Sequence, residues 1–214
     1  MGKQRGSVLI VSLVFIVLMS LIAVTGMQIS SLEERMSGNH QDKDRAFQAA
    51  EAALIEGEEF VLSTDFDREV HFKEACSGSA LCFDEDCAGG LCLTGRVTSA
   101  CEIRDTENEP WLEDSNTQFG SPLTDGNDGA GNIINVWTTN GKHRTASKGL
   151  SGVTTKAKYI VEFICFTPKD PDAPAPDPYP NDSAEWSEMY RITALGTGGQ
   201  DTNRVMLQSI FKKD

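Results

Sequence analysis

Six cysteines are the residues whose type and spacing most directly suggest chemistry in this chain. Five of them lie between residues 76 and 101, in a stretch that also contains several glycines, and the sixth lies in a β-branched segment. An even number of cysteines beyond an apolar N-terminal run predicts disulfides formed in an oxidising compartment. Fifteen pairings are possible, so the connectivity stays open. The cysteines are Cys76, Cys82, Cys87, Cys92, Cys101 and Cys165.

Metal binding is the competing interpretation of these residues. The four-residue gaps on either side of Cys87 also suit a structural zinc site. We favour disulfides, because an exported chain meets oxidant before it meets much metal. Residues 125–132 resemble a calcium loop, but Gly129 and Val136 occupy ligand positions of the EF-hand order, so a plain turn explains the segment. We predict no bound metal and no cofactor.

The histidines show no catalytic spacing. His40 lies in a helical pattern, His143 lies in a basic loop with glycine, and we expect both to be solvated, while His71 has no acid or nucleophile at a familiar distance. Phosphate-binding glycine motifs, G-x-S-x-G and paired metal-binding histidines are all absent from the sequence. We therefore predict that the protein is not an enzyme.

The net charge of −13 over 214 residues points away from nucleic acid. Such a surface repels phosphate backbones, so nucleic-acid binding is not expected as a bulk property. The acidity is typical of a protein that stays soluble outside the cell.

An apolar segment begins close to the N-terminus. No charged residue lies between Gly6 and Leu32, and a helix over residues 8–24 would be about 25 Å long, close to the ~30 Å hydrocarbon core of a bilayer. The helical pattern then continues without a turn signal, which predicts one helix of roughly 80 Å that lies against a globular domain with its second half. We expect one face to carry Leu32, Met36, Phe47, Ala50, Leu54 and Val61.

The C-terminal third has the composition of strands. We predict strands over residues 156–166, 186–195 and 204–211, the last two joined as an antiparallel hairpin by the turn at residues 196–199. Short strands are candidates at residues 96–103 and 133–137, and a strand or turn at residues 70–72, with a long loop over 104–132. Residues 168–180 hold six prolines and predict an extended loop, either a contact surface or a spacer. The predicted fold class is α+β.

The N-terminal part of the chain resembles a known family. Residues 3–6 before an uncharged run resemble a type IV prepilin leader, and residues 31–39 and 46–54 resemble the N-terminal signature of the minor pilin PilX family. A shorter similarity covers residues 190–196 and 205–211. The resemblance implies a pilin fold, in which a long helix packs its C-terminal half on an antiparallel sheet. It also implies a leader (1–6), a helix (7–62) and a β-rich head (63–214).

The resemblance further implies processing by a prepilin peptidase, which would cleave after Gly6 and methylate the new N-terminus at Ser7. Most pilins carry glutamate at the fifth mature residue, which here is Val11. Inserting a carboxylate at mid-bilayer costs about 2.5–3.5 kcal/mol of free energy. We therefore expect glutamate at this position only where a partner group interacts with it. In related systems its absence goes with a place at the filament tip, which the resemblance therefore implies here. The alternative is that Val11 simply suits a membrane anchor.

The function implied is that of a minor pilin that primes type IV pilus assembly. Its partners would be other minor pilins, the major pilin, the prepilin peptidase and a large tip adhesin. It would reside in the bacterial inner membrane as a single-pass protein with a periplasmic head, and then in the pilus at the cell surface. Two alternatives stay open: a K-like minor pseudopilin of type II secretion, which usually carries a large α-domain insert, and a signal-anchored adhesive domain.

Overall fold

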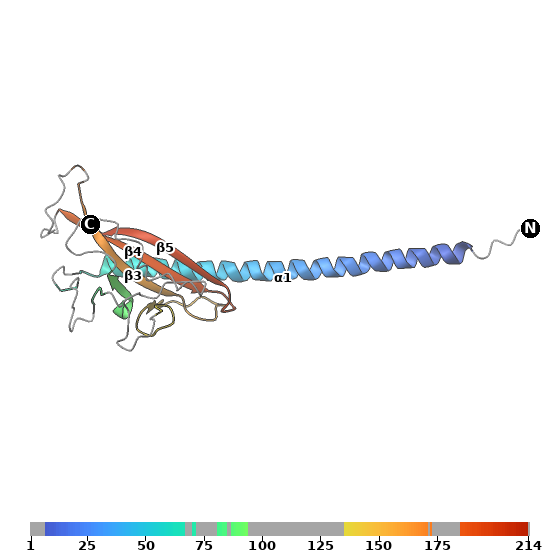
Figure 1. The fold of residues 1–214 in the computed structure, drawn as a ribbon, viewed down its shortest axis with the longest axis horizontal. Helices are drawn as coiled ribbons and strands as arrows, with labels where there is room; N and C mark the ends of the chain where they lie inside the picture. The colour runs from blue at the N-terminus through green and yellow to red at the C-terminus, as the bar shows by residue number, and fades with distance from the viewer. Residues whose placement is uncertain are drawn as a thin grey trace, which may run out of the picture. The chain divides into compact units, whose positions relative to one another are not determined.

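The computed structural model of the chain describes residues 7–66, 70–71, 81–84, 87–93, 135–170, 172 and 185–213. The chain divides into two compact units, residues 1–42 and 43–214. The fold class is α+β, as predicted, with one helix before the strands (Figure 1). The elements are α1 (Ser7–Ser63), the 3-10 turn η1 (Ala88–Gly90), β1 (Leu91–Leu93), β2 (Arg144–Thr145), β3 (Lys158–Pro168), β4 (Trp186–Thr197) and β5 (Arg204–Lys213).

The first unit is helical throughout its described length. Every described side chain from Val8 to Gln41 is exposed, and the apolar ones include Leu9, Phe15 and Ile22. This part of the helix is apolar on all sides, whereas packing against a single core would cover only one stripe of it. Among the described residues of this unit, no other element covers its apolar side chains.

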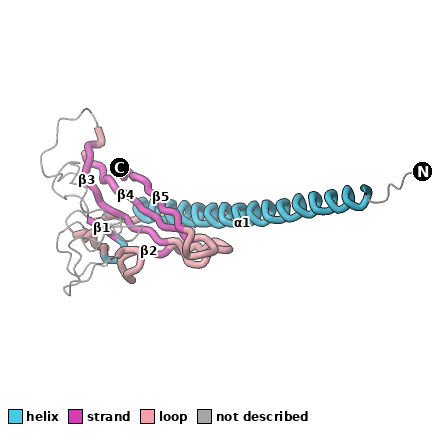
Figure 2. The backbone as a smooth tube through the Cα atoms, turned by 45° about the vertical axis from the view of Figure 1, so that its right-hand side comes forward, coloured by secondary structure: helices cyan, strands magenta, loops and turns pink. Residues whose placement is uncertain are grey.

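In the second unit, the strands form one sheet in the order β1-β3-β4-β5, with β2 also paired to β3 (Figure 2). β3, β4 and β5 are antiparallel neighbours, whereas β1 runs parallel to β3. The sheet is therefore mixed, which differs from the purely antiparallel head that was expected. A parallel pair needs a connection of a dozen or more residues, and the stretch between Leu93 and Lys158 supplies it.

The three long strands lie where the sequence placed them. The β4–β5 hairpin is confirmed, but its turn lies later than predicted: Gly196 is still paired, with Val205, and the turn closes through Gly198 N–H donating to Asn203 O at 2.9 Å. A register shift lies between Phe163 and Cys165 in β3. The described part of the predicted strand 133–137 is instead a turn, because Asn135 Oδ1 accepts from the backbone N–H of Trp137 at 2.9 Å.

The second-unit part of α1 packs on the sheet through small side chains. This confirms part of the predicted apolar face, because Ala50 and Val61 are buried and Leu54 packs against the core. Phe47 corrects it, since its side chain is 46% exposed, and Leu32 and Met36 are exposed in the first unit. Small side chains let the helix backbone approach the strands closely. The buried α1 residues are Ala46, Ala49, Ala50, Ala53, Gly57 and Val61.

Gly196 marks the tightest point of this packing. A Cβ added there would lie 2.1 Å from Ala46 O and 2.5 Å from Ala50 N, both backbone atoms of α1. Real Cβ atoms essentially never come within 3.0 Å of another heavy atom. Only glycine therefore suits this position of β4, although its φ is ordinary.

Aromatic rings fill the core where α1 ends. Phe66 lies 5.0 Å from Phe83 and 5.8 Å from Tyr190, centroid to centroid, and Phe163 lies 5.8 Å from Tyr190. Edge-on and tilted arrangements such as these are the favoured geometries of aromatic pairs. A second apolar cluster, which includes Ile160 and Leu195, alternates with the first along the strands and so lies on the opposite sheet face.

Candidate functional site

The apolar stretch of α1 is suited to a lipid or to other apolar helices. It is long and apolar enough to cross a membrane, with a mean hydropathy of 3.0 in its most apolar window and none of that window buried. Its hydroxyl groups are satisfied within the helix: Ser12 Oγ donates to Leu9 O at 2.9 Å, and Ser20 Oγ donates to Val17 O at 2.8 Å. Internal satisfaction of polar groups is what a hydrocarbon environment requires.

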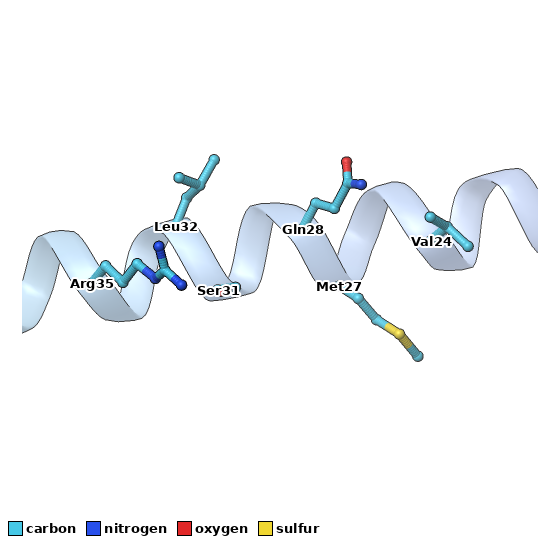
Figure 3. A pocket seen from close by; sticks show the side chains of 6 residues that line it. All are labelled: Val24, Met27, Gln28, Ser31, Leu32 and Arg35. Atoms are coloured by element: carbon cyan, nitrogen blue, oxygen red, sulfur yellow. The ribbon is translucent and has the colours of Figure 1, made fainter.

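A shallow concavity lies where this stretch changes from apolar to charged (Figure 3). All of its lining comes from one side of α1, so it is a gap between neighbouring side chains and encloses no ligand. Arg35 is its only charged residue, four residues after Ser31. The lining residues are Val24, Met27, Gln28, Ser31, Leu32 and Arg35.

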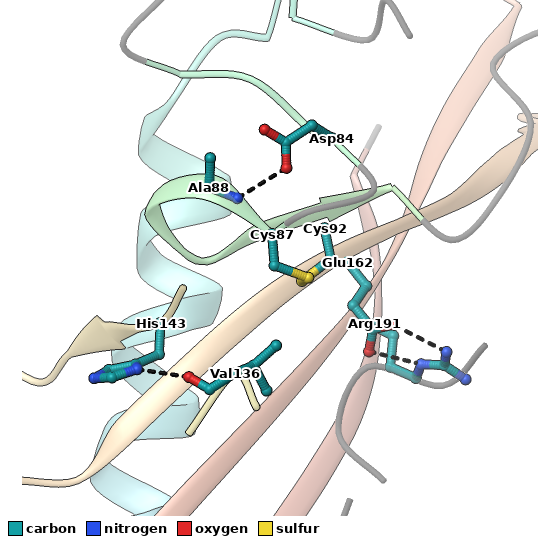
Figure 4. Close-up of a disulfide and its surroundings, with 8 residues drawn as sticks. All are labelled: Asp84, Cys87, Ala88, Cys92, Val136, His143, Glu162 and Arg191. Carbon is teal, nitrogen blue, oxygen red and sulfur yellow. Dashed lines mark hydrogen bonds and ion pairs between the residues drawn. A yellow bond between two sulfur atoms is a disulfide. The ribbon is translucent and has the colours of Figure 1, made fainter. Parts of the chain in front are cut away.

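A disulfide fixes the edge of the sheet in the second unit. Cys87 and Cys92 are bonded across η1, and Asp84 Oδ1 accepts from Ala88 N–H at 2.8 Å at the start of the same turn (Figure 4). Their sulfur atoms are bound to each other, so the zinc alternative is wrong for this pair. Cys82 and Cys165 are disulfide-bonded too, and the described cysteines include no free thiol.

An ion pair between a buried carboxylate and a partly exposed guanidinium lies beside the disulfide. Glu162 of β3 is fully buried, and Arg191 of β4 donates to it through two nitrogens at 3.0 and 3.1 Å (Figure 4). The two residues are register partners, and Glu162 is also the register partner of Cys92 in β1. This fork geometry holds the two strands in register. Neither residue stands out in the sequence, because opposite charges in separate strands can be matched only once the strand pairing is known.

His143 is held more tightly than was predicted. Its Nδ1 lies 2.7 Å from Val136 O, and the ring is half-buried rather than solvated (Figure 4). Burial lowers the pKa of His143, and the nearby Lys158 charge lowers it further against the backbone bonds that raise it. His40 is exposed on α1, and the His71 ring lies 6.0 Å from that of Phe66.

Several predicted features lie outside the described residues: the leader through Gly6, Cys76, Cys101, the strand 96–103, the calcium-like segment 125–132 and most of the proline-rich segment 168–180. Ser7 is the first residue of α1. Within the described part of the chain, no group of three or more His, Cys, Asp or Glu residues is arranged to hold a metal ion.

A long helix with an uncovered apolar N-terminal part, whose C-terminal part packs on a sheet, defines the pilin class of protein. Two family models match the chain: PilX N-terminal over residues 5–54, and Type IV pilus assembly protein PilX C-term over residues 93–213. The chain therefore belongs to the PilX family of type IV pilus assembly proteins, a family of structural pilus components. Neither a curated protein nor a solved structure matches it.

Proposed function

We propose that this chain is a minor pilin that primes type IV pilus assembly and is incorporated at or near the pilus tip. The observation that carries the proposal is the uncovered apolar part of α1, whose side chains are all exposed from Val8 to Gln41. In the precursor, lipid covers this surface in the inner membrane, with the second unit in the periplasm. During assembly, the helices of other minor pilins and of the major pilin replace the lipid.

The tip position is supported by Val11, which supplies no carboxylate at the fifth residue after Gly6. A subunit without that group cannot neutralise the N-terminal amine of a neighbour, so it suits the end of a filament. The proposal includes cleavage after Gly6 and methylation of Ser7 by a prepilin peptidase. A large tip adhesin is a further proposed partner.

The first test is N-terminal mass spectrometry of the membrane-extracted protein beside a Gly6→Ala variant. We expect a methylated Ser7 terminus that is lost in the variant. An intact Met1 would instead indicate a signal-anchored domain, and a terminus near Gly26 would indicate a cleaved secretory signal. Either result contradicts the pilin proposal.

A second measurement separates a pilus from a secretion pseudopilus. Deletion of the chain should reduce surface pili, and antibody labelling of sheared pili should mark filament ends. Normal piliation with impaired protein secretion would instead favour the K-like pseudopilin.

A further inference from the structure

The last strand of the chain forms a long open edge of the sheet. Among the described strands, β5 pairs with β4 alone, whereas the edge strand β1 is also bridged on its far side by Asp84 (Figure 2). Edge strands present unpaired backbone groups to which another strand can add, and proteins usually protect them with proline, charges or a β-bulge. β5 has no proline or charge between Val205 and Phe211, and its pairing with β4 continues over its whole length without a register shift.

The register shows which backbone groups of β5 point away from β4. Gly198 N–H donates to Asn203 O at 2.9 Å, and these two residues extend the β4–β5 register by one pair. Since hydrogen-bonded and non-hydrogen-bonded pairs alternate in an antiparallel ladder, Met206, Gln208 and Ile210 belong to non-hydrogen-bonded pairs. Their N–H and C=O groups therefore point to the open edge, where no described residue bonds to them.

The side chains at these positions lie on the sheet face away from α1. Ser209 Oγ donates to Glu58 Oε1 of α1 at 2.8 Å, so Ser209 faces the helix and its neighbours in β5 face the other way. On that other face Ile210 is 67% exposed, and Gln208 Nε2 donates to Thr193 Oγ1 at 3.0 Å. An exposed isoleucine beside open backbone groups offers an added strand an apolar contact as well as a hydrogen-bond ladder.

The charges of β5 favour a partner strand over a second copy of this chain. β5 carries three cationic side chains and no acid: Arg204, Lys212 and Lys213. Arg204 and Lys212 lie equally far on either side of Gln208, so symmetric antiparallel pairing of two copies about Gln208 sets Arg204 of one copy opposite Lys212 of the other. Like charges directly opposite each other destabilise a strand pair. An added strand with an acid near each end places opposite charges there instead.

We propose that the open edge of β5 binds an extended, acid-ended segment of a partner protein by strand addition. The backbone groups of Met206, Gln208 and Ile210 supply the ladder, which gives such a complex its affinity. Arg204 and Lys212, both exposed, select carboxylates at the two ends of the added strand. The site lies in the second unit and depends on neither the tip position nor the processing proposed above.

The test is an anisotropy titration of the full-length chain in detergent micelles with a fluorescein-labelled peptide as long as β5. In this probe, valine and threonine alternate between two glutamates at each end. We expect saturable binding, and slower hydrogen–deuterium exchange in residues 204–213 when the peptide is bound.

Two substitutions at one position separate the backbone ladder from the side chain. Ile210→Pro should weaken binding at least tenfold, because it removes an outward N–H and its ring blocks the approach of an added backbone. Ile210→Thr is the matched control, since it keeps that N–H and a β-branched side chain, and it should weaken binding less than threefold. Circular dichroism of each variant checks that the fold is intact.

A charge reversal tests the choice of partner and leaves the backbone of β5 unchanged, so it decides even where Ile210→Pro fails to fold. Arg204→Glu should weaken binding of the glutamate-ended peptide about tenfold and tighten binding of the same peptide with lysines at its ends. Lys148→Glu is the control, because Lys148 is exposed and lies outside β5, and it should change either affinity less than twofold.

Four outcomes overturn the proposal. Absence of saturable binding, or binding that leaves exchange in β5 unchanged, means that no strand adds at this edge. Equal weakening by Ile210→Pro and Ile210→Thr means that the contact uses no backbone ladder. Equal effects of Arg204→Glu and Lys148→Glu mean that the peptide follows net charge. Self-association of the unchanged chain that Ile210→Pro abolishes, measured by sedimentation, makes a second copy the occupant.

Discussion

Replacement of Gly196 by alanine tests the close contact between α1 and the sheet. The new Cβ would lie 2.1 Å from Ala46 O, about 1.3 Å short of the 3.4 Å at which ordinary contact begins. The atoms it meets belong to the backbone of a helix, so no single side chain can move aside. Overpacking of this kind typically costs about 1–3 kcal/mol, and we expect Gly196→Ala to lie near 3 kcal/mol because α1 must shift as a whole.

Urea unfolding of the full-length chain in detergent, followed by tryptophan fluorescence, measures this cost. With a denaturant dependence of about 1–3 kcal/mol per molar urea, a loss of ~3 kcal/mol lowers the midpoint by roughly 1–3 M. Trp137 and Trp186 both lie in the second unit and are buried, so their emission reports the unit that contains Gly196.

Gly149 provides the matched control. A Cβ at Gly149 would meet nothing closer than Lys156 Cγ at 3.7 Å, so Gly149→Ala should change stability by less than about 0.5 kcal/mol. If Gly196→Ala is as stable as Gly149→Ala, the helix is not held against β4 as we infer.

Two further predictions concern polar groups of the second unit. Glu162→Leu removes the buried carboxylate of the ion pair and leaves the partly exposed Arg191 without its partner, so it should destabilise by about 2 kcal/mol. The double change with Arg191→Leu should recover much of that loss. Urea unfolding of the unchanged chain, the single variant and the double variant measures this, and a double variant no more stable than the single would contradict the pairing. For His143, the folded-state pKa is lowered from 6.5, chiefly by burial, so the unfolded chain takes up the proton first as pH falls. The stability that His143 contributes is thus present above pH 6.5 and is lost as pH falls through the lower folded-state pKa. Unfolding midpoints between about pH 8 and 5 should slope less in His143→Gln than in the unchanged chain, and equal slopes would refute the assignment.

Much of the fold could be predicted from local sequence patterns. The charge-free run from Gly6 to Leu32 and the helix formers around Ala50 predicted one long helix, and the β-branched segments predicted β3, β4 and β5. The short strands β1 and β2 were not predicted. A strand of two or three residues carries no period of its own, and each of these exists only through pairing with β3.

The groups of side chains that contact one another were harder to predict from the sequence. Hydrophobic periodicity placed Phe47 on the packed face of α1, whereas most of that face consists of alanines and Gly57, followed by Val61. Alanine counts toward helix propensity in any position, so sequence alone does not show that a stripe of alanines faces a strand.

The sequence by itself determined the membrane-length helix, the acidic character, the oxidisable cysteines and the resemblance to the PilX family, because each of these depends on composition or on spacing within a few turns. The tertiary structure alone decided which helix face is buried, that Cys87 and Cys92 are bonded, and that Glu162 meets Arg191. These contacts join segments that come together only through the order and register of the strands. The periodicity of a single segment determines neither the order nor the register.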